Sequence, residues 1–183
     1  MSLVRVRMKW DQDPTRIWRD VELGSERTLG HLASVFTPDV GLLDTGHLWF
    51  FGVDGKYWNS PIMYLHPMDY RDTKAKKEDP MELGMMVPDA EIHNADETTF
   101  EDLDLEEGDR LTYLFDYGDE WRFYLIVKEI DPDGPFDRSP EITKRKGGYL
   151  NQYMRSPEEP LVYSEEEWKK QMGSSADNSS IIE

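Results

Sequence analysis

Acidic side chains gather at one short turn of this 183-residue chain, where they could supply the hard oxygen ligands that magnesium and calcium prefer. The turn carries Asp116, Asp119 and Glu120, and Asp131 and Asp133 follow the same segment. A metal-assisted hydrolase would need such carboxylates in a concave pocket with an open coordination position. Carboxylates are common throughout this chain, and they also accept hydrogen bonds from turn amides. We therefore expect turn-forming carboxylates, with no bound metal and no cofactor.

Histidine and cysteine give little further support for catalysis. The four histidines show no pair at the spacing of metal ligands, and His47 alone lies in a recognisable motif, where its expected role is to hydrogen-bond nearby backbone at the start of a strand. The chain has no cysteine, which excludes thiol nucleophiles, disulfides and thiolate zinc sites. No nucleophile elbow, phosphate loop or dinucleotide fingerprint occurs. The sequence thus predicts no catalytic residue and favours a non-catalytic protein.

The acidic turn joins two predicted strands of a hairpin between Leu111 and Ile130. The two-residue period places one inward face on each arm: Leu111, Tyr113, Phe115 and Tyr117 on the first, and Trp121, Phe123, Leu125 and Val127 on the second. Gly118 is expected to take the positive φ of a tight reversal. Trp121 opens the inward register of the second arm, so we expect it to be buried in the core.

Further elements follow from hydrophobic periodicity and from capping signals. We predict strands over residues 3–10, 17–23 and 47–53, a helix that begins at Ser25 or Thr28 and ends at Pro38, a strand within 85–92, a helical turn over 99–105 and a short helix over 164–172. Residues 61–88 are interpreted as an inserted loop with at most short elements. Trp18 lies on the strand face opposite Ile17 and Val21, where we expect the rest of the domain to cover it.

This element order predicts an α+β fold with a mixed β-sheet, a helix packed on one face, and the strand order of the β-grasp, ubiquitin-like fold. Residues 1–172 are expected to form a single domain, and residues 173–183 a flexible C-terminal tail. No run approaches the roughly 20 apolar residues that span a bilayer. We expect a cytoplasmic protein that does not contact membranes.

Five segments resemble the motifs of the pRiA plasmid ORF-three-like family, which includes passenger proteins of insertion elements. They are residues 116–121 (DYGDEW), residues 14–19 (PTRIWR), residues 28–36, residues 47–50 (HLWF), and residues 99–103 followed by Gly108 and Asp109. The resemblance covers residues 3–130 and implies a plasmid or mobile-element setting, but no activity that could be assigned to individual residues. Many relatives continue with a cysteine- and glycine-rich segment, so the absence of cysteine here prevents any transfer of a metal or redox role.

Net charge indicates the sign of a binding partner. The formal charge is −17, which argues against direct binding of nucleic acid, because phosphate neutralisation needs clustered lysine and arginine. Between Glu78 and Asp109 the chain has no lysine or arginine. We expect an acidic surface that binds a basic protein partner, formed by Glu101, Asp102, Glu106 and Glu107 and by the turn residues Asp116, Tyr117, Gly118, Asp119 and Trp121.

The sequence therefore favours a non-catalytic protein-interaction module. Two alternatives stay open: a metal-assisted hydrolase at the acidic hairpin turn, and a nucleic-acid mimic whose carboxylates are spaced like phosphates. The oligomeric state and the identity of the partner also stay open.

Overall fold

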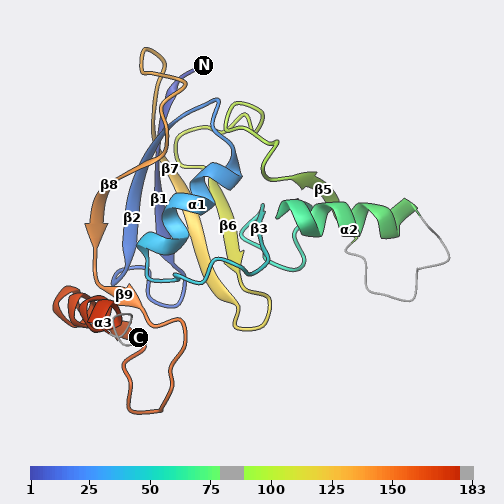
Figure 1. Cartoon of the computed structure of the whole chain (residues 1–183). Helices are drawn as coiled ribbons and strands as arrows, with labels where there is room; N and C mark the ends of the chain where they lie inside the picture. Colours follow the sequence, from blue (N-terminus) through green and yellow to red (C-terminus); the bar gives the residue numbers. More distant parts are fainter. Residues whose placement is uncertain (79–88, 178–183) are drawn as a thin grey trace.

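The computed structural model describes residues 1–78 and 89–177 as an eight-stranded sheet with three helices and a small two-stranded sheet (Figure 1). The strands are β1 (Leu3–Trp10), β2 (Trp18–Gly24), β3 (Trp49–Gly52), β4 (Ile62–Leu65), β5 (Glu91–Asn94), β6 (Arg110–Phe115), β7 (Trp121–Asp131), β8 (Glu141–Lys146), β9 (Tyr149–Leu150) and β10 (Val162–Tyr163). The helices are α1 (Leu29–Asp39), α2 (Pro67–Glu78) and α3 (Glu165–Asp177).

The large sheet is mixed, which confirms the α+β class. Its order is β5-β4-β3-β6-β7-β1-β2-β8, and every neighbouring pair is antiparallel except β4 and β5. The expected β-grasp order is not confirmed, because β1 lies between β2 and β7 and is antiparallel to both. The predicted hairpin is present as β6 and β7, with Phe115 opposite Trp121 at its closed end.

Helix α1 covers one face of the sheet and builds the main core. Thr28 caps its first turn by accepting the backbone N–H of His31, whose ring Nδ1 in turn accepts the N–H of Thr28. The Phe36 ring of α1 packs edge-to-face against Phe123, with the ring centroids 5.0 Å apart. Tyr113 stacks on Phe51 at 4.6 Å, and its hydroxyl lies 2.7 Å from a threonine hydroxyl of α1. The helix expected to begin at Ser25 or Thr28 therefore forms, with Thr28 as its cap, and carries the core.

A second core cluster lies on the opposite face of the sheet, at its β3 and β4 side. Phe50 and Leu114 are fully buried there, and Tyr70 of α2 packs against them. Within residues 61–88, β4 is a short element as expected, but the expectation of at most short elements was wrong for the three turns of α2, and residues 79–88 lie outside the described residues. Helix α2 is polar along its length and buries only Thr73, so it lacks the apolar stripe from which a helix is predicted.

Arg19 is the largest side chain that is completely shielded from solvent. Its Nε donates to Asp39 Oδ2 at the end of α1 at 2.7 Å. Its Nη1 donates to the carbonyl oxygens of Trp18 and Lys146, and its Nη2 to that of Gly148 at 2.8 Å. One guanidinium thus joins β2, the end of α1 and the turn after β8. In that turn Gly147 has a φ of +75°, and a Cβ there would lie 2.0 Å from a backbone oxygen.

Helix α3 extends past the helix expected over 164–172 and runs to Asp177, and residues 178–183 lie outside the described residues, so the flexible tail stays a prediction. The strand expected within 85–92 overlaps β5 only at Glu91 and Ile92, and residues 85–88 also lie outside the described part. Across the described ranges, no helix combines the length and apolarity that crossing a bilayer requires.

The Arg19 contacts predict a large stability cost for its removal. Arg19→Leu should lower the free energy of unfolding by roughly 3 to 5 kcal/mol, because it leaves several buried carbonyl oxygens without a donor and removes the buried one of the two arginines that bind the Asp39 carboxylate. Urea denaturation measures the change. Arg145→Leu is the matched control, since Arg145 also binds Asp39 but its side chain is 49% exposed. That control should cost at most about 1 kcal/mol, and equal losses in the two variants would contradict the assignment.

Candidate functional site

The turn between β6 and β7 is built by two residues with left-handed backbone conformations. Asp116 has a φ of +63° and Glu120 a φ of +51°, whereas Gly118 does not have a positive φ, so that expectation was wrong. Asp116 Oδ1 accepts the backbone N–H groups of Gly118 at 2.9 Å and Asp119 at 3.4 Å. A carboxylate that closes its own turn can hold an aspartate in the left-handed region.

The left-handed conformation of Asp116 coincides with a change of face for the next residue. Tyr117 does not continue the inward face of β6, as the two-residue period predicts, but packs in the second core cluster. Its ring contacts Trp58 with centroids 4.8 Å apart, and its hydroxyl donates to Asp69 of α2 at 2.5 Å. Burial, and then the Asp69 carboxylate, raise the pKa of Tyr117 far above its ordinary value. Tyr117 is therefore a neutral anchor between the turn and α2.

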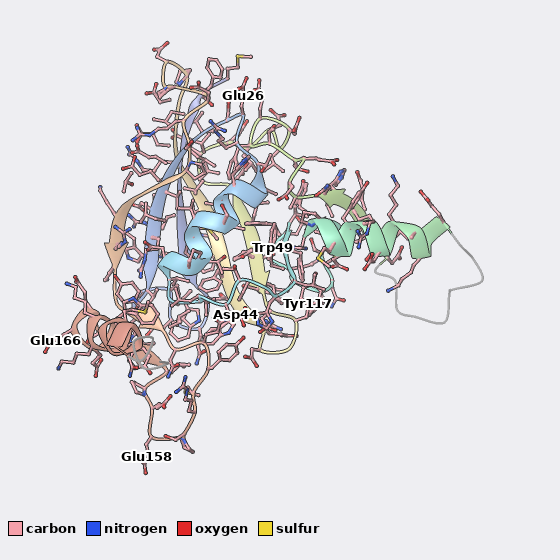
Figure 2. The ribbon with its side chains drawn as sticks, viewed as in Figure 1. Glu26, Asp44, Trp49, Tyr117, Glu158 and Glu166 are labelled. Carbon is pink, nitrogen blue, oxygen red and sulfur yellow. The ribbon has the colours of Figure 1, made fainter. Side chains whose placement is uncertain are left out.

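His47 lies against the other side of the same turn. Its Nδ1 is 3.1 Å from Asp116 Oδ2, and its Nε2 is 2.7 Å from the hydroxyl of Tyr153. The Tyr153 hydroxyl donates to Asp44 Oδ2 at 2.9 Å. The expected contact of this ring with nearby backbone is corrected to contacts with two side chains. Asp44 and Tyr117 mark this end of the sheet in Figure 2, and Glu26 lies at the other end.

Asp44, His47, Asp116 and Tyr153 form one hydrogen-bonded cluster. The Tyr153 hydroxyl donates to Asp44, whose pKa is lowered by that hydrogen bond and by the backbone N–H of Gly46. The same carboxylate raises the pKa of Tyr153 to about 12. Nε2 of His47 faces the tyrosine oxygen, and Nδ1 faces Asp116 Oδ2. Both ring nitrogens are therefore engaged within the cluster.

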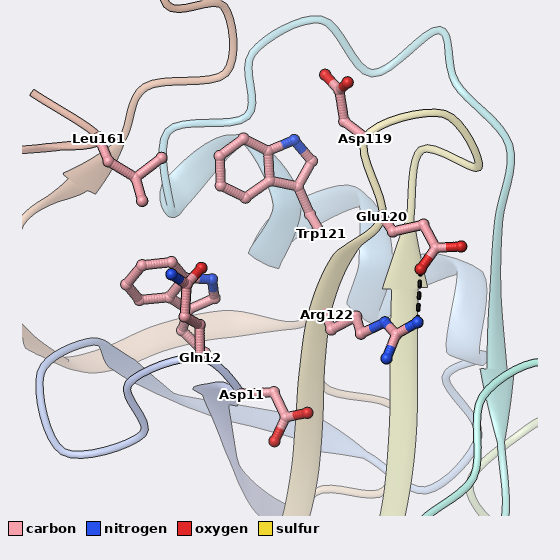
Figure 3. Close-up of a pocket in the computed structure, with 8 residues that line it drawn as sticks. Asp11, Gln12, Asp119, Glu120, Trp121, Arg122 and Leu161 are labelled. Carbon is pink, nitrogen blue, oxygen red and sulfur yellow. Dashed lines mark hydrogen bonds and ion pairs between the residues drawn. The ribbon is translucent and has the colours of Figure 1, made fainter. Parts of the chain in front are cut away.

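Trp121 lines a hollow of about 340 Å³ on the outer side of the turn (Figure 3). Its walls also include Trp10, Gln12, Asp119 and Leu161. Trp121 packs against the main core but stays partly exposed, so its expected burial is only partial. Its indole N–H is shielded from solvent and has no hydrogen-bond partner.

Glu120 holds the opposite edge of the turn by accepting from two side chains. One donor is the indole N–H of Trp58 at 2.8 Å, and the other is Arg122 at 2.5 Å, a contact drawn in Figure 3. These two bonds, that of Trp58 first, lower the pKa of Glu120. The carboxylate therefore stays ionised and fixes Trp58, which is 42% exposed, beside the turn.

A wider groove of about 580 Å³ lies between α3, the loop after α1 and the loop after β9. We call it the α3 groove, and its lining comprises Gly41, Leu43, Asp44, Asn151, Gln152, Tyr153, Arg155, Glu159, Tyr163, Trp168, Gln171 and Met172. Asp44 and Tyr153 belong both to this groove and to the cluster around His47. The groove is therefore connected to the hairpin turn through hydrogen bonds.

The acidic residues predicted from the 78–109 stretch lie at the far end of the hairpin and do not join the turn residues. Asp102 accepts the backbone N–H and the hydroxyl of Thr99, and these bonds lower its pKa. Glu107 accepts the backbone N–H of Ile130, at the far end of β7. Glu101 pairs with the N-terminal ammonium, and Glu106 is exposed. Two of these four carboxylates hold local backbone, so the stretch is only partly a free charged surface.

Asp44 and Tyr153 were missed by sequence reasoning, because their partners are distant in the chain and no motif marks them. Within residues 1–78 and 89–177, no group of three or more histidine, aspartate or glutamate side chains is placed to hold a metal ion. Both oxygens of Asp116 are already engaged, one by the turn amides and one by His47.

Comparison with known proteins identifies a family and a solved structure of similar fold. The model of the plasmid pRiA4b ORF-3-like protein family matches residues 2–152. A crystal structure of a protein of unknown function from Methanosarcina mazei Go1, MM3350, is similar in fold with a TM-score of 0.54 and 15% identity. The match covers 100% of this chain and 84% of that one. No curated protein matches the chain.

The cluster around His47 predicts a coupled titration. Tyr153→Phe should raise the pKa of Asp44 toward its ordinary value, because it removes the strongest hydrogen bond to that carboxylate. A lowered pKa stabilises the folded state above the unfolded value near 3.9, and that contribution is lost as the pH falls through the folded value. NMR titration of side-chain carboxyl carbons measures the shift. Asp102 is the internal control and should not move, whereas an unchanged Asp44 would refute the contact.

Trp121 generates a second prediction from its partial burial and its unpaired N–H. Trp121→Ala should destabilise the protein by roughly 3 kcal/mol, the low end of the range for deleting a large aromatic. Trp121→Phe should change stability by less than about 1 kcal/mol, because the lost area is offset by removal of a buried donor that has no acceptor. Thermal and urea denaturation of both variants test this difference, and similar losses in the two would show that the N–H has a partner.

Proposed function

This chain belongs to the plasmid pRiA4b ORF-3-like family, and we propose that it is a non-catalytic interaction module whose α3 groove binds a basic, partly apolar segment of a partner protein. A plasmid or mobile-element setting is part of this proposal. The proposal places the acidic binding surface at the end of the sheet that carries the hairpin turn, and not at the 78–109 stretch expected from the sequence.

Exposed apolar side chains around the groove are the observation that carries the proposal. Leu43 is 48% exposed, Tyr153 48%, Met154 52% and Met172 44%. Three of them line the α3 groove, and Met154 follows Tyr153 directly in the chain. Isolated apolar side chains are normal on a surface, but several gathered at one concave site are typical of a binding site. Methionine adapts its shape to varied partners.

The charge of the groove favours a basic segment. Its lining contains the carboxylates of Asp44 and Glu159 and one cation, Arg155. Glu159 accepts hydrogen bonds from the backbone N–H of Arg155 and from the side-chain amide N–H of Asn151. These bonds lower the pKa of Glu159, so its carboxylate stays ionised. Carboxylates at the rim of an apolar site raise the association rate of a cationic partner and help to fix its orientation.

The two alternative functions receive less support from the same contacts. The metal-assisted hydrolase would need free oxygen ligands at the turn. Both Asp116 oxygens are engaged, one by the turn amides and the other by His47. The nucleic-acid mimic would need a projecting row of carboxylates, and Asp102 and Glu107 are directed to local backbone. The interaction module requires only the exposed side chains that the α3 groove has.

Selection of peptides on the full chain tests the proposal without a known partner. A random peptide library displayed on phage should yield sequences that combine lysine or arginine with large apolar residues. Synthetic peptides from this selection should lose at least tenfold in affinity for Met172→Lys, because a cation then occupies the groove. Their binding to the parent protein should also weaken as salt rises.

Met68→Lys is the matched control, since Met68 is 56% exposed on α2 and makes no part of the groove. It should bind the selected peptides as well as the parent protein does. Selected peptides that are acidic or lack apolar residues, or equal losses in both methionine variants, would overturn the proposal.

A further inference from the structure

The sheet face opposite α1 carries an alternating row of aromatic and lysine side chains. The register places Tyr124 of β7 opposite Lys9 of β1, Lys9 opposite Trp18 of β2, and Trp18 opposite Lys146 of β8. Residues that oppose one another in neighbouring strands share a face, and strands lie roughly 4.8 Å apart, so the row spans about 14 Å. All four side chains are partly or fully exposed. In Figure 1 this face points away from the viewer, behind α1.

Three arginines lie over aromatic rings next to this row. The Arg7 guanidinium carbon is 3.7 Å from the centre of the Trp18 ring, that of Arg122 is 4.9 Å from Tyr57, and that of Arg110 is 5.8 Å from Tyr124. Two bonds from Arg7 to Asp20, at 2.6 and 2.9 Å, fix its plane on the indole. Trp18 is therefore covered by an arginine and not by a helix, which corrects the expectation that the domain covers it.

The local charge of this face is positive although the whole chain is strongly acidic. Lys9, Arg110, Lys144 and Lys146 take part in none of the ion pairs formed by the described residues. Asp20, Glu22 and Glu129 share this face and are paired with arginines, Asp20 with Arg7 and the two glutamates with Arg5. The net charge of −17 is an average over the whole chain and does not describe this surface.

A hollow of about 340 Å³ adjoins the β7 end of the row. It is lined by Asp11, Tyr57, Arg110, Thr112 and Tyr124, among others, and the Asp11 carboxylate accepts the Tyr57 hydroxyl at 3.1 Å. Two rings, a guanidinium, a carboxylate and a threonine beside one small concavity suit a flat ring with polar edges, and the cations of the neighbouring row suit an anion linked to it.

We infer that this face binds single-stranded nucleic acid. The lysines contact phosphates, and Tyr124, the Arg7–Trp18 stack and the hollow beside Tyr57 receive bases. Exposed aromatic side chains and arginine planes on an open sheet stack two or three unpaired bases, and stacking accepts any base. A duplex hides its bases and would gain only the phosphate contacts. An acidic peptide would not use the aromatic rings in this alternating order, so nucleic acid fits the row better.

Fluorescence anisotropy with labelled 12-nucleotide oligouridine and oligothymidine tests the inference on the full chain. Both single strands should bind at 50 mM salt, and a hairpin duplex should bind at least tenfold more weakly. The logarithm of the association constant should fall linearly with the logarithm of the salt concentration, with a slope of roughly −0.7 for each phosphate contacted. The double variant Lys9→Gln, Lys146→Gln should lose about tenfold or more. Tyr124→Leu should lose a similar factor while keeping the salt slope.

Matched charge removal elsewhere provides the control. Lys74→Gln with Lys76→Gln on α2 changes the net charge equally and should leave binding unchanged. The inference is overturned by absence of binding to either strand, by equal losses in the two double variants, or by a Tyr124→Leu variant whose affinity for single strands falls no more than its affinity for heparin and duplex. Circular dichroism melting verifies that each variant is folded. Met172→Lys alters only the α3 groove and should not affect these affinities, so the two proposals fail independently.

Discussion

A guanidinium removed from water must find an acceptor for each of its protons, and this requirement at Arg19 organises one side of the molecule. The acceptors are a carboxylate at the end of α1 and carbonyl oxygens on either side of Gly147. Each acceptor fixes a different segment, so the position of α1 on the sheet and the path after β8 are linked to one residue of β2. If one of these segments detached, the buried guanidinium would lose an acceptor without gaining water in its place. The three segments are therefore expected to fold and unfold together. The motif that includes Arg19 resembles that of the family, and its buried role gives that motif a physical reason.

Local signals in the sequence were sufficient for the hairpin, the cap at Thr28 and the α+β class. They failed where the backbone departs from a simple period, as at Asp116, whose left-handed φ precedes the displacement of Tyr117 to the other face. They also failed for α2, which is recognised by its position over the second core cluster and not by an apolar stripe.

The cluster around His47 could be predicted only in part, since the histidine and Asp116 lie in separate motifs. Tyr153 is 106 residues from His47, and neither its type nor its neighbours mark it. Such contacts depend on how the loop after β9 folds back over the turn, which no short pattern encodes. The same holds for the aromatic and lysine row, because it exists only through the register of four strands. The net charge of the whole sequence does not reveal this row, since acidic and basic side chains occupy different surfaces.

The position of β1 between β2 and β7 has a consequence for synthesis of the chain. Arg5 pairs with Glu129, 124 residues later, so the hairpin of β1 and β2 leaves the ribosome with the long outer edge of β1 unpaired. At translation rates of about 5 to 20 residues per second, that edge waits roughly 6 to 25 seconds for β7. Unpaired edges recruit other chains, and charged side chains oppose such recruitment. The alternation of Arg5, Arg7 and Lys9 with apolar residues along β1 places a cation at every second step of that edge during the delay.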